Sequence, residues 1–189
     1  VDDAINQQIA DNIVKQNLGI EAIYSSPLIR CLSLAKVIQN QQQIGLAIIE
    51  DLKEMNFGVY DGIAFDEIHQ EQNKWQQLER FWQMPAQQTL PNAESLAEFY
   101  QRITKAWQQI VSQLTGQVKQ QKQSNSLLVC HGGVIRMILA HILGIDYGNA
   151  RWFNQLEIAY GSVTIVELKN NTAVIKQIAQ PMINYKKAH

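Results

Sequence analysis

A short apolar run that leads directly into two glycines and a helix constrains the fold of this chain more than any other feature. Residues 126–130 have the length and aliphatic character of a buried strand. His131, Gly132 and Gly133 follow at once, and residues 134–143 have the pattern of an apolar helix. A strand that turns so tightly into a helix is typical of α/β proteins, in which ligands bind beyond the carboxyl ends of parallel strands.

Strand-like and helix-like patterns alternate along the rest of the chain. The alternation predicts a single domain over residues 1–189 with an α/β fold: a three-layer α/β/α sandwich with a mostly parallel central sheet and an antiparallel hairpin at one edge. Helices are expected over residues 2–17, 27–43, 92–114 and 134–143, and one or two more over residues 64–83. Strands are expected over residues 20–25, 46–50, 126–130, 162–168 and 172–177, with a turn at 170–171.

Two of the expected helices carry start signals. Ser26 precedes a proline, which fits a helix with Ser26 as its N-cap and the proline at its first position. Ser95 stands three residues before Glu98, as in a capping box, and Asn92 is an alternative cap for the same helix. The first of these helices would hold Arg30 one turn inside it, with the side chain directed back towards the end of the preceding strand.

Charge and cysteine content limit the classes of partner. The net charge is −1 at pH 7, so no basic field favours nucleic acid or a membrane surface. Cys31 and Cys130 lie far apart and are expected as reduced thiols in a cytoplasmic protein. No apolar run in the sequence approaches the length of a membrane span, and no His or Cys spacing resembles a zinc site. An anion would have to be bound by a local cluster.

His131 and Arg30 are candidates for such a cluster. His131 stands at a helix N-terminus, where free N–H groups and the positive end of the helix dipole favour a phosphate, and Gly132 lets the backbone approach it closely. A guanidinium in the first turn of another helix gives forked, charge-assisted hydrogen bonds to phosphate oxygens. The alternatives are a histidine satisfied by local hydrogen bonds and a solvated arginine.

Glu54 is a candidate proton donor. It is flanked by Leu52 and Met55, and partial burial there would raise the pKa of its carboxyl enough to donate a proton at neutral pH. The alternative is a loop residue that forms a salt bridge.

Taken in order, four segments resemble the histidine phosphatase, or phosphoglycerate-mutase-like, superfamily. Residues 22–35 contain its Ser-Ser-x-x-x-Arg element, residues 52–62 resemble its acid loop, residues 91–95 resemble its Gly-Glu-Ser helix start, and residues 128–136 resemble its second-histidine motif. Residues 81–110 are most similar to α-ribazole phosphatases.

The resemblance implies a mechanism in which a phosphoryl group passes to a histidine and then to water. His131 and Arg30 would bind the phosphoryl oxygens, and Glu54 would protonate the leaving alkoxide and later accept a proton from water. Glu94 and Ser95 would lie at the rim near the substrate. No metal or organic cofactor is implied.

One element of the family pattern is missing. The nucleophilic histidine should stand in an Arg-His-Gly element at the end of a first strand, and the 189 residues contain no Arg-His-Gly. Either this strand precedes Val1 in a longer protein, or the chain is a non-catalytic relative. We favour the first explanation because Arg30, Glu54 and His131 are all retained. Without the first strand, backbone groups of the 126–130 strand would face an unfilled slot.

The sequence therefore predicts a phosphomonoesterase that hydrolyses a small phosphate ester, with α-ribazole 5′-phosphate of cobalamin biosynthesis as the first candidate. The alternatives are a broad-specificity sugar or nucleotide phosphatase, a phosphoglycerate-mutase-type enzyme, and a non-catalytic module that binds phosphate esters. The 189-residue chain alone is expected to be inactive, and a homodimer is left open. Trp75, Phe81 and Trp82 could stack on a base, but packing in the core is the favoured interpretation.

Overall fold

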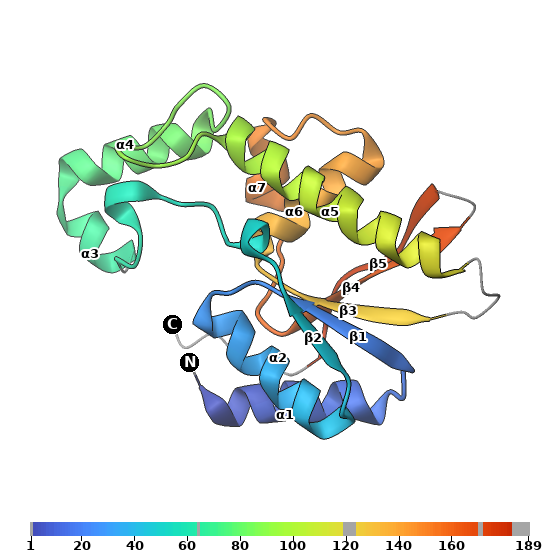
Figure 1. Ribbon diagram of the computed structural model, residues 1–189. Helices are drawn as coiled ribbons and strands as arrows, with labels where there is room; N and C mark the ends of the chain where they lie inside the picture. The colour runs from blue at the N-terminus through green and yellow to red at the C-terminus, as the bar shows by residue number, and fades with distance from the viewer. Residues whose placement is uncertain (1, 64, 119–123, 170–171, 183–189) are drawn as a thin grey trace.

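The computed structural model describes residues 2–63, 65–118, 124–169 and 172–182, in which helices pack on both sides of a set of strands (Figure 1). In chain order the elements are α1 (Asp3–Lys15), β1 (Ile20–Ser25), α2 (Ile29–Gln42), β2 (Gly45–Ile48), η1 (Glu50–Leu52), η2 (Gly58–Tyr60), α3 (Phe65–Gln70), α4 (Gln72–Gln83), α5 (Leu96–Val118), β3 (Asn125–Val129), α6 (Gly132–Leu143), α7 (Ala150–Gln155), β4 (Ser162–Lys169) and β5 (Thr172–Pro181).

The strands form a parallel sheet and an antiparallel hairpin. In the parallel sheet the order is β2-β1-β3, and Tyr24 of β1 is in register with Ala47 on one side and Leu128 on the other. The hairpin consists of β4 and β5. Among the described residues, β3 is hydrogen-bonded to β1 alone and β4 to β5 alone. The predicted parallel sheet and the antiparallel pair of strands are confirmed. The predicted place of that pair was wrong: among the described residues β4 and β5 form a separate two-stranded sheet and not an edge of the parallel one. The turn predicted at 170–171 lies outside the described residues.

Helices cover both faces of the parallel sheet. In Figure 1, α1 and α2 lie below the strands and α5 and α6 lie above them. The side chains follow this division with the period of two that a strand imposes. Ile23 and Val129 belong to the apolar cluster formed with α1 and α2, whereas Tyr24 and Leu128 pack into the larger cluster formed with α5 and α6. The predicted three-layer arrangement is therefore confirmed.

The capping box before α5 forms as predicted. The backbone N–H of Ser95 donates to the Glu98 carboxylate at 2.8 Å, and the N–H of Glu98 donates to the Ser95 hydroxyl at 3.2 Å. Asn92 is not the cap: its φ is 59°, in the left-handed region, and the helix begins four residues later at Leu96.

The start of α2 differs from the prediction. The helix begins at Ile29, with Leu28 as an N-cap in extended conformation. The hydroxyl of Ser26 does accept a hydrogen bond from the N–H of Leu28, at 3.3 Å, but within a turn that precedes the helix. The same hydroxyl also contacts Nε2 of His131, at 2.8 Å.

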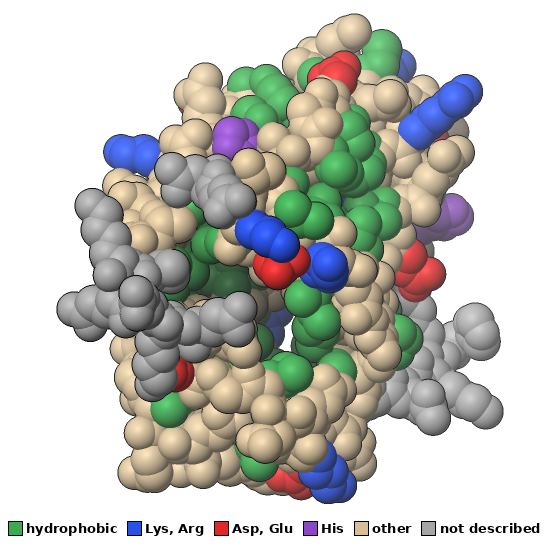
Figure 2. Space-filling model, turned by 90° about the vertical axis from the view of Figure 1, so that its right-hand side faces the viewer, with side chains coloured by type: hydrophobic (Ala, Val, Ile, Leu, Met, Phe, Trp, Pro, Cys, Tyr) green, Lys and Arg blue, Asp and Glu red, His purple; other side chains and the backbone are tan. Residues whose placement is uncertain are grey.

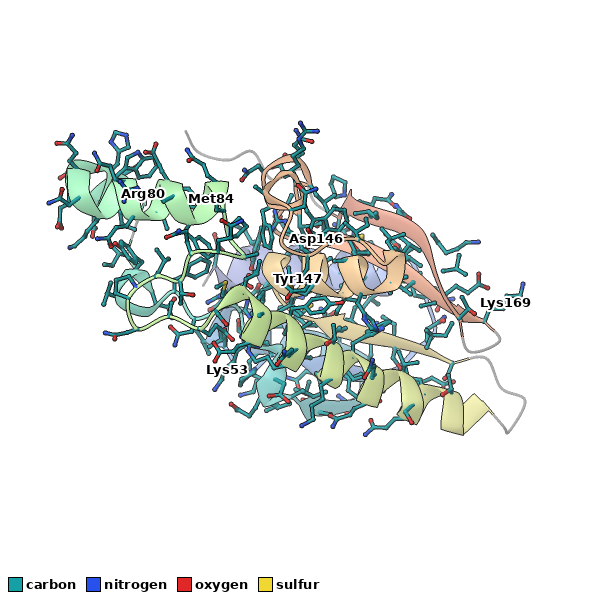
Figure 3. The ribbon with its side chains drawn as sticks, turned by 90° about the horizontal axis from the view of Figure 1, so that it is seen from above. Lys53, Arg80, Met84, Asp146, Tyr147 and Lys169 are labelled. Atoms are coloured by element: carbon teal, nitrogen blue, oxygen red, sulfur yellow. The ribbon has the colours of Figure 1, made fainter. Side chains whose placement is uncertain are left out.

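An arm made of α3 and α4 extends away from the sheet. Viewed from above, α4 with Arg80 and Met84 projects beyond the strands, while α5 and α6 lie side by side over them (Figure 3). The arm has an apolar interior: Leu78 and Phe81 are 1% and 4% exposed. Phe81 is thus a core residue, as expected. Within the described ranges, no helix combines the length and apolar character needed to cross a membrane.

Candidate functional site

Arg30 and His131 meet at the carboxyl ends of two neighbouring strands. Arg30 lies in the first turn of α2, which follows β1, and His131 is the N-cap of α6, which follows β3. Because β1 and β3 are parallel and adjacent, the residues that follow them share one edge of the sheet. Arg30 Nε donates to His131 Nδ1 at 3.0 Å. Both residues line the same cavity, so the predicted convergence of the guanidinium and the imidazole is confirmed.

The contacts of His131 fix its tautomer. An arginine N–H can only donate, so Nδ1 of His131 is an acceptor and the ring proton lies on Nε2. His131 Nε2 then donates to the Ser26 hydroxyl at 2.8 Å. His131 is 5% exposed. Burial, together with the charges of Arg30 and Arg102, lowers the pKa of His131 to about 4, so its imidazole is neutral at physiological pH.

Glu54 lies at the N-terminus of α6, beside the same cavity. Its carboxylate accepts hydrogen bonds from the backbone N–H groups of Gly133 and Met55, each at 3.1 Å. Burial raises the pKa of Glu54, against the opposing effect of these hydrogen bonds and of Arg30. Glu54 therefore combines a fixed position with a carboxyl that is more easily protonated than an exposed one, as a proton donor requires.

The surroundings of the two glycines at the start of α6 differ in how much space they leave for a side chain. A Cβ on Gly133 would overlap the Glu54 carboxylate, so only glycine lets the acid approach this N–H. A Cβ on Gly132 would lie 3.4 Å from Arg136 Nη1, an ordinary close contact. One of the helix N–H groups that we expected to be free for phosphate is thus committed to Glu54. Gly132 lines the cavity, and its predicted contact with substrate stays a prediction.

Arg102 of α5 holds the Glu54 loop and was missed by sequence reasoning. Its guanidinium donates to the backbone carbonyls of Asp51 and Lys53, both at 2.8 Å, and of Glu54 at 3.0 Å. It also forms a forked pair with the Glu94 carboxylate, at 2.9 Å from Nε and 2.6 Å from Nη2. This one side chain connects α5, the acid loop and the segment before α5.

The sequence does hold a signal for Arg102. It stands between Phe99 and Ile103, which are 1% and 0% exposed, so it lies at the boundary of the buried face of α5. Its guanidinium lies 4.7 Å from the centre of the Phe99 ring. A charged residue in that position needs a partner, but its main partners are carbonyls about fifty residues earlier, which no local pattern identifies.

Glu94 and Ser95 are occupied by structural contacts. Besides the Arg102 pair, the Glu94 carboxylate accepts a hydrogen bond from the N–H of Asn56 at 2.8 Å. Ser95 is engaged in the capping box of α5. Their predicted contact with substrate stays a prediction, and both residues have a clear role in shaping the acid loop and the helix behind it.

Arg136 is a second cation near the acid. It lies on α6 and donates from Nε and Nη2 to the carbonyl of Leu156, at 3.2 and 2.8 Å. Burial lowers the pKa of Arg136, and Glu54 opposes that effect. The chain from α6 to β4 is thereby attached to the site.

Cys31 lies against the imidazole, and its burial disfavours the thiolate form. Its sulfur is 3.5 Å from His131 Nε2, and burial raises the pKa of this thiol to about 12. Burial raises the pKa of Cys130 as well. Both cysteines are free thiols. In the part of the chain that the structure describes, no group of three or more His, Cys, Asp or Glu side chains could hold a metal ion.

The family model of the histidine phosphatase superfamily (branch 1) matches residues 7–181. The chain belongs to this superfamily. The match covers all of the strands and the whole Arg30–Glu54–His131 cluster.

Relatives of this histidine phosphatase chain include a candidate phosphoserine phosphatase of Hydrogenobacter thermophilus, which is 30% identical over 137 residues, or 69% of this chain. The chain spans 59% of the length of that relative. Among solved structures, Bacillus stearothermophilus YhfR matches with a TM-score of 0.77 and 22% identity over 95% of this chain and 84% of its own. The α-ribazole phosphatase of Shigella flexneri matches with a TM-score of 0.71 and 20% identity, and the match covers 96% of this chain and 84% of that enzyme. These likenesses confirm the α/β fold.

Proposed function

We propose that this chain forms the greater part of a phosphomonoesterase that works through a phosphohistidine. The observation that carries the proposal is the pairing of Arg30 with a neutral His131 beside Glu54, whose pKa is raised, in one cavity. A guanidinium and an imidazole suit the oxygens of a phosphoryl group, and the acid suits its leaving oxygen.

The reaction would proceed in two displacements. A nucleophilic histidine, which we place in an Arg-His-Gly segment ahead of Val1, attacks phosphorus and forms a P–N bond while the bond to the leaving oxygen breaks. Glu54 gives its proton to that oxygen, so the product leaves as an alcohol. Water then attacks the phosphohistidine, Glu54 takes a proton from it, and free phosphate and the original histidine are restored.

Arg30 and His131 would stabilise the charge on the transferred group. The bond from Arg30 to His131 uses Nε, which leaves both terminal nitrogens of the guanidinium for phosphoryl oxygens. The Nε2–H of His131 can exchange the Ser26 hydroxyl for a phosphoryl oxygen, a stronger acceptor because it is charged.

We propose α-ribazole 5′-phosphate as the first substrate to test. Residues 81–110 resemble α-ribazole phosphatases, and the Shigella flexneri enzyme of that name has a similar fold. A phosphate-ester binding protein without turnover is the second candidate, because no Arg-His-Gly occurs in the 189 residues.

The deciding experiment compares the 189-residue chain with the chain extended by the segment encoded ahead of it. We expect the extended chain to hydrolyse p-nitrophenyl phosphate and α-ribazole 5′-phosphate and to yield an acid-labile phosphohistidine after rapid quenching in alkali. We expect the 189-residue chain to bind inorganic phosphate without turnover. An extended chain that binds phosphate but never releases product would exclude the enzyme and leave the binding protein.

A further inference from the structure

Asn6 is a buried polar residue on a helix face that is otherwise apolar. It is 0% exposed, whereas the other buried residues of α1 are aliphatic: Ile9, Ala10 and Ile13. A buried amide lowers stability unless it finds hydrogen-bond partners, so an aliphatic side chain would be the simpler choice at this position. The remaining buried polar residues in the described part of the chain all lie at the ends of β1 and β3: Ser25, Ser26 and His131.

Both ends of the Asn6 amide are hydrogen-bonded, and the bonds run in one direction. Ser33 Oγ donates to the carbonyl of Ile29 at 2.7 Å, so its proton is committed and the oxygen must accept from Asn6 Nδ2, at 3.1 Å. Asn6 Oδ1 in turn accepts a hydrogen bond from the Tyr160 hydroxyl at 2.9 Å. The resulting chain connects α1 to two segments that are distant in sequence.

One end of this chain holds the turn of α2 that carries Arg30. The helices α1 and α2 lie side by side below the strands (Figure 1). Ile29 directly precedes Arg30, and Ser33 follows one turn later. The N-cap of α2, Leu28, makes no side-chain capping bond, so the usual attachment of a helix start is missing. The bond from Asn6 is therefore an attachment for the turn from which the guanidinium extends.

The other end of the chain holds the segment between α7 and β4. Tyr160 belongs to this segment, and so does Ile158, whose Cβ would lie 3.6 Å from a Cβ on Gly132 at the start of α6. Tyr160 lines the same cavity as Arg30 and His131. The cavity runs along β3 and β4 to the end of the molecule that faces the viewer in Figure 2, where the surface is hollowed. The hydrogen-bond chain thus reaches both sides of the candidate site.

We propose that Asn6 is a positioning residue of the candidate site. By bonding to both Ser33 and Tyr160, it fixes the turn that carries Arg30 relative to the segment beside the start of α6. A buried hydrogen-bond network favours one arrangement of its members, because any other arrangement leaves polar groups unpaired. What Arg30 binds rests on the proposed function, whereas its placement by Asn6 rests on the hydrogen bonds.

The direct test follows the bond from Arg30 to His131. In the 189-residue chain, the Nε–H of Arg30 donates to His131 Nδ1, and NMR can measure how fast this proton exchanges with water. We expect Asn6→Ala to accelerate the exchange by about tenfold, because the guanidinium leaves the imidazole more often. Ser33→Ala and Tyr160→Phe each remove one bond of the chain and should accelerate it in the same direction.

A matched control separates positioning from general loss of stability. Ile13→Val removes one methylene from the same buried face of α1 and should lower the urea midpoint without changing the exchange at Arg30. Tyr160→Phe deletes only a hydroxyl from a half-exposed side chain, so it decides the question even if Asn6→Ala does not fold. Unchanged exchange in Tyr160→Phe, or equal acceleration in Ile13→Val, would overturn the proposal.

Binding of inorganic phosphate provides a second readout. A displaced guanidinium makes longer and less well aligned bonds to phosphate oxygens, so Asn6→Ala should weaken binding by about tenfold. If Asn6 acts through Arg30, the double variant with Arg30→Lys should bind no more weakly than Arg30→Lys alone. Losses that simply add would show that Asn6 does not act through Arg30.

The positioning role and the proposed function can fail separately. A wild-type chain that binds no phosphate would remove the phosphoryl group as the partner of Arg30. Faster exchange at Arg30 in Asn6→Ala and Tyr160→Phe, but not in Ile13→Val, would uphold the positioning role in that case as well.

Discussion

Arg30 Nε lies 3.0 Å from Nδ1 of His131, a residue 101 positions later in the chain, and the bond requires a neutral imidazole. Protonation of Nδ1 would replace this hydrogen bond by repulsion between two cations. The pKa of His131, about 4, lies below the 6.5 of an unfolded histidine. The stability linked to His131 is therefore complete above pH 6.5 and is lost as the pH falls towards 4, by up to about 3 kcal/mol.

Urea unfolding between pH 4 and pH 7 checks this first prediction. The free energy of unfolding should depend less steeply on pH in His131→Asn, because asparagine at position 131 does not titrate between pH 4 and pH 7. An NMR titration that places the His131 pKa near 6.5 would contradict it.

Phosphate should raise the pKa of His131. A bound anion favours the protonated imidazole and gives Arg30 a better acceptor than a ring nitrogen. We expect the NMR titration of His131 to move to higher pH in the presence of inorganic phosphate. Arg30→Lys should weaken phosphate binding by about tenfold, because lysine lacks the forked donors. Arg151→Lys, on the exposed surface of α7, is the matched control and should bind phosphate normally.

Gly133→Ala should destabilise the protein. The added Cβ overlaps the Glu54 carboxylate, so the acid must leave the N–H of α6. The loss of this partly buried hydrogen bond should lower the free energy of unfolding by about 1–3 kcal/mol. Gly116→Ala is the control: it lies within α5 with open space around it and should stabilise the helix by about 0.5–1 kcal/mol. Thermal unfolding of the two variants should shift in opposite directions, and a shift in the same direction would contradict the role given to Gly133.

Arg102→Met should loosen the acid loop. The change removes three hydrogen bonds to loop carbonyls and leaves the half-buried Glu94 carboxylate without its cation. The free energy of unfolding should therefore fall by about 1–3 kcal/mol. Hydrogen exchange in residues 51–56 should accelerate as well. Arg80→Met, on the exposed side of α4, should change neither the free energy of unfolding nor the hydrogen exchange of the loop. Unaltered exchange in the loop would show that Arg102 does not hold it.

Glu54→Gln should discriminate between leaving groups. In a chain that contains the nucleophile, loss of the acid should slow the hydrolysis of an alkyl phosphate by about 10²–10⁴-fold. Formation of the phosphohistidine from p-nitrophenyl phosphate should be less affected, because nitrophenolate leaves without a proton. Rapid-quench measurement of phosphoenzyme formation compares the loss of rate with the two esters. An equal loss with both would contradict proton donation by Glu54.

Much of the fold follows from local patterns, and part of the site follows from the fold. The periodic segments became α1, α2, α5 and α6, and the meeting of Arg30 with His131 follows from parallel strands that end at one edge. Two features could not be predicted because they depend on contacts distant in sequence. Arg102 acts on carbonyls about fifty residues away, and Gly133 is shaped by a carboxylate from another loop. The short α7 has six residues, too few for a helical period to show in the sequence, and none of them is buried.

The separation of β3 from β4 has a consequence for how the catalytic site of the proposed enzyme would be completed. If the nucleophilic histidine of the proposed function stands on a strand that pairs with β3, the placement of that strand would complete both the sheet and the catalytic site. A partly folded molecule would then be unable to attack cellular phosphate esters, and any mutation that weakens the seating of that strand would lower stability and turnover together.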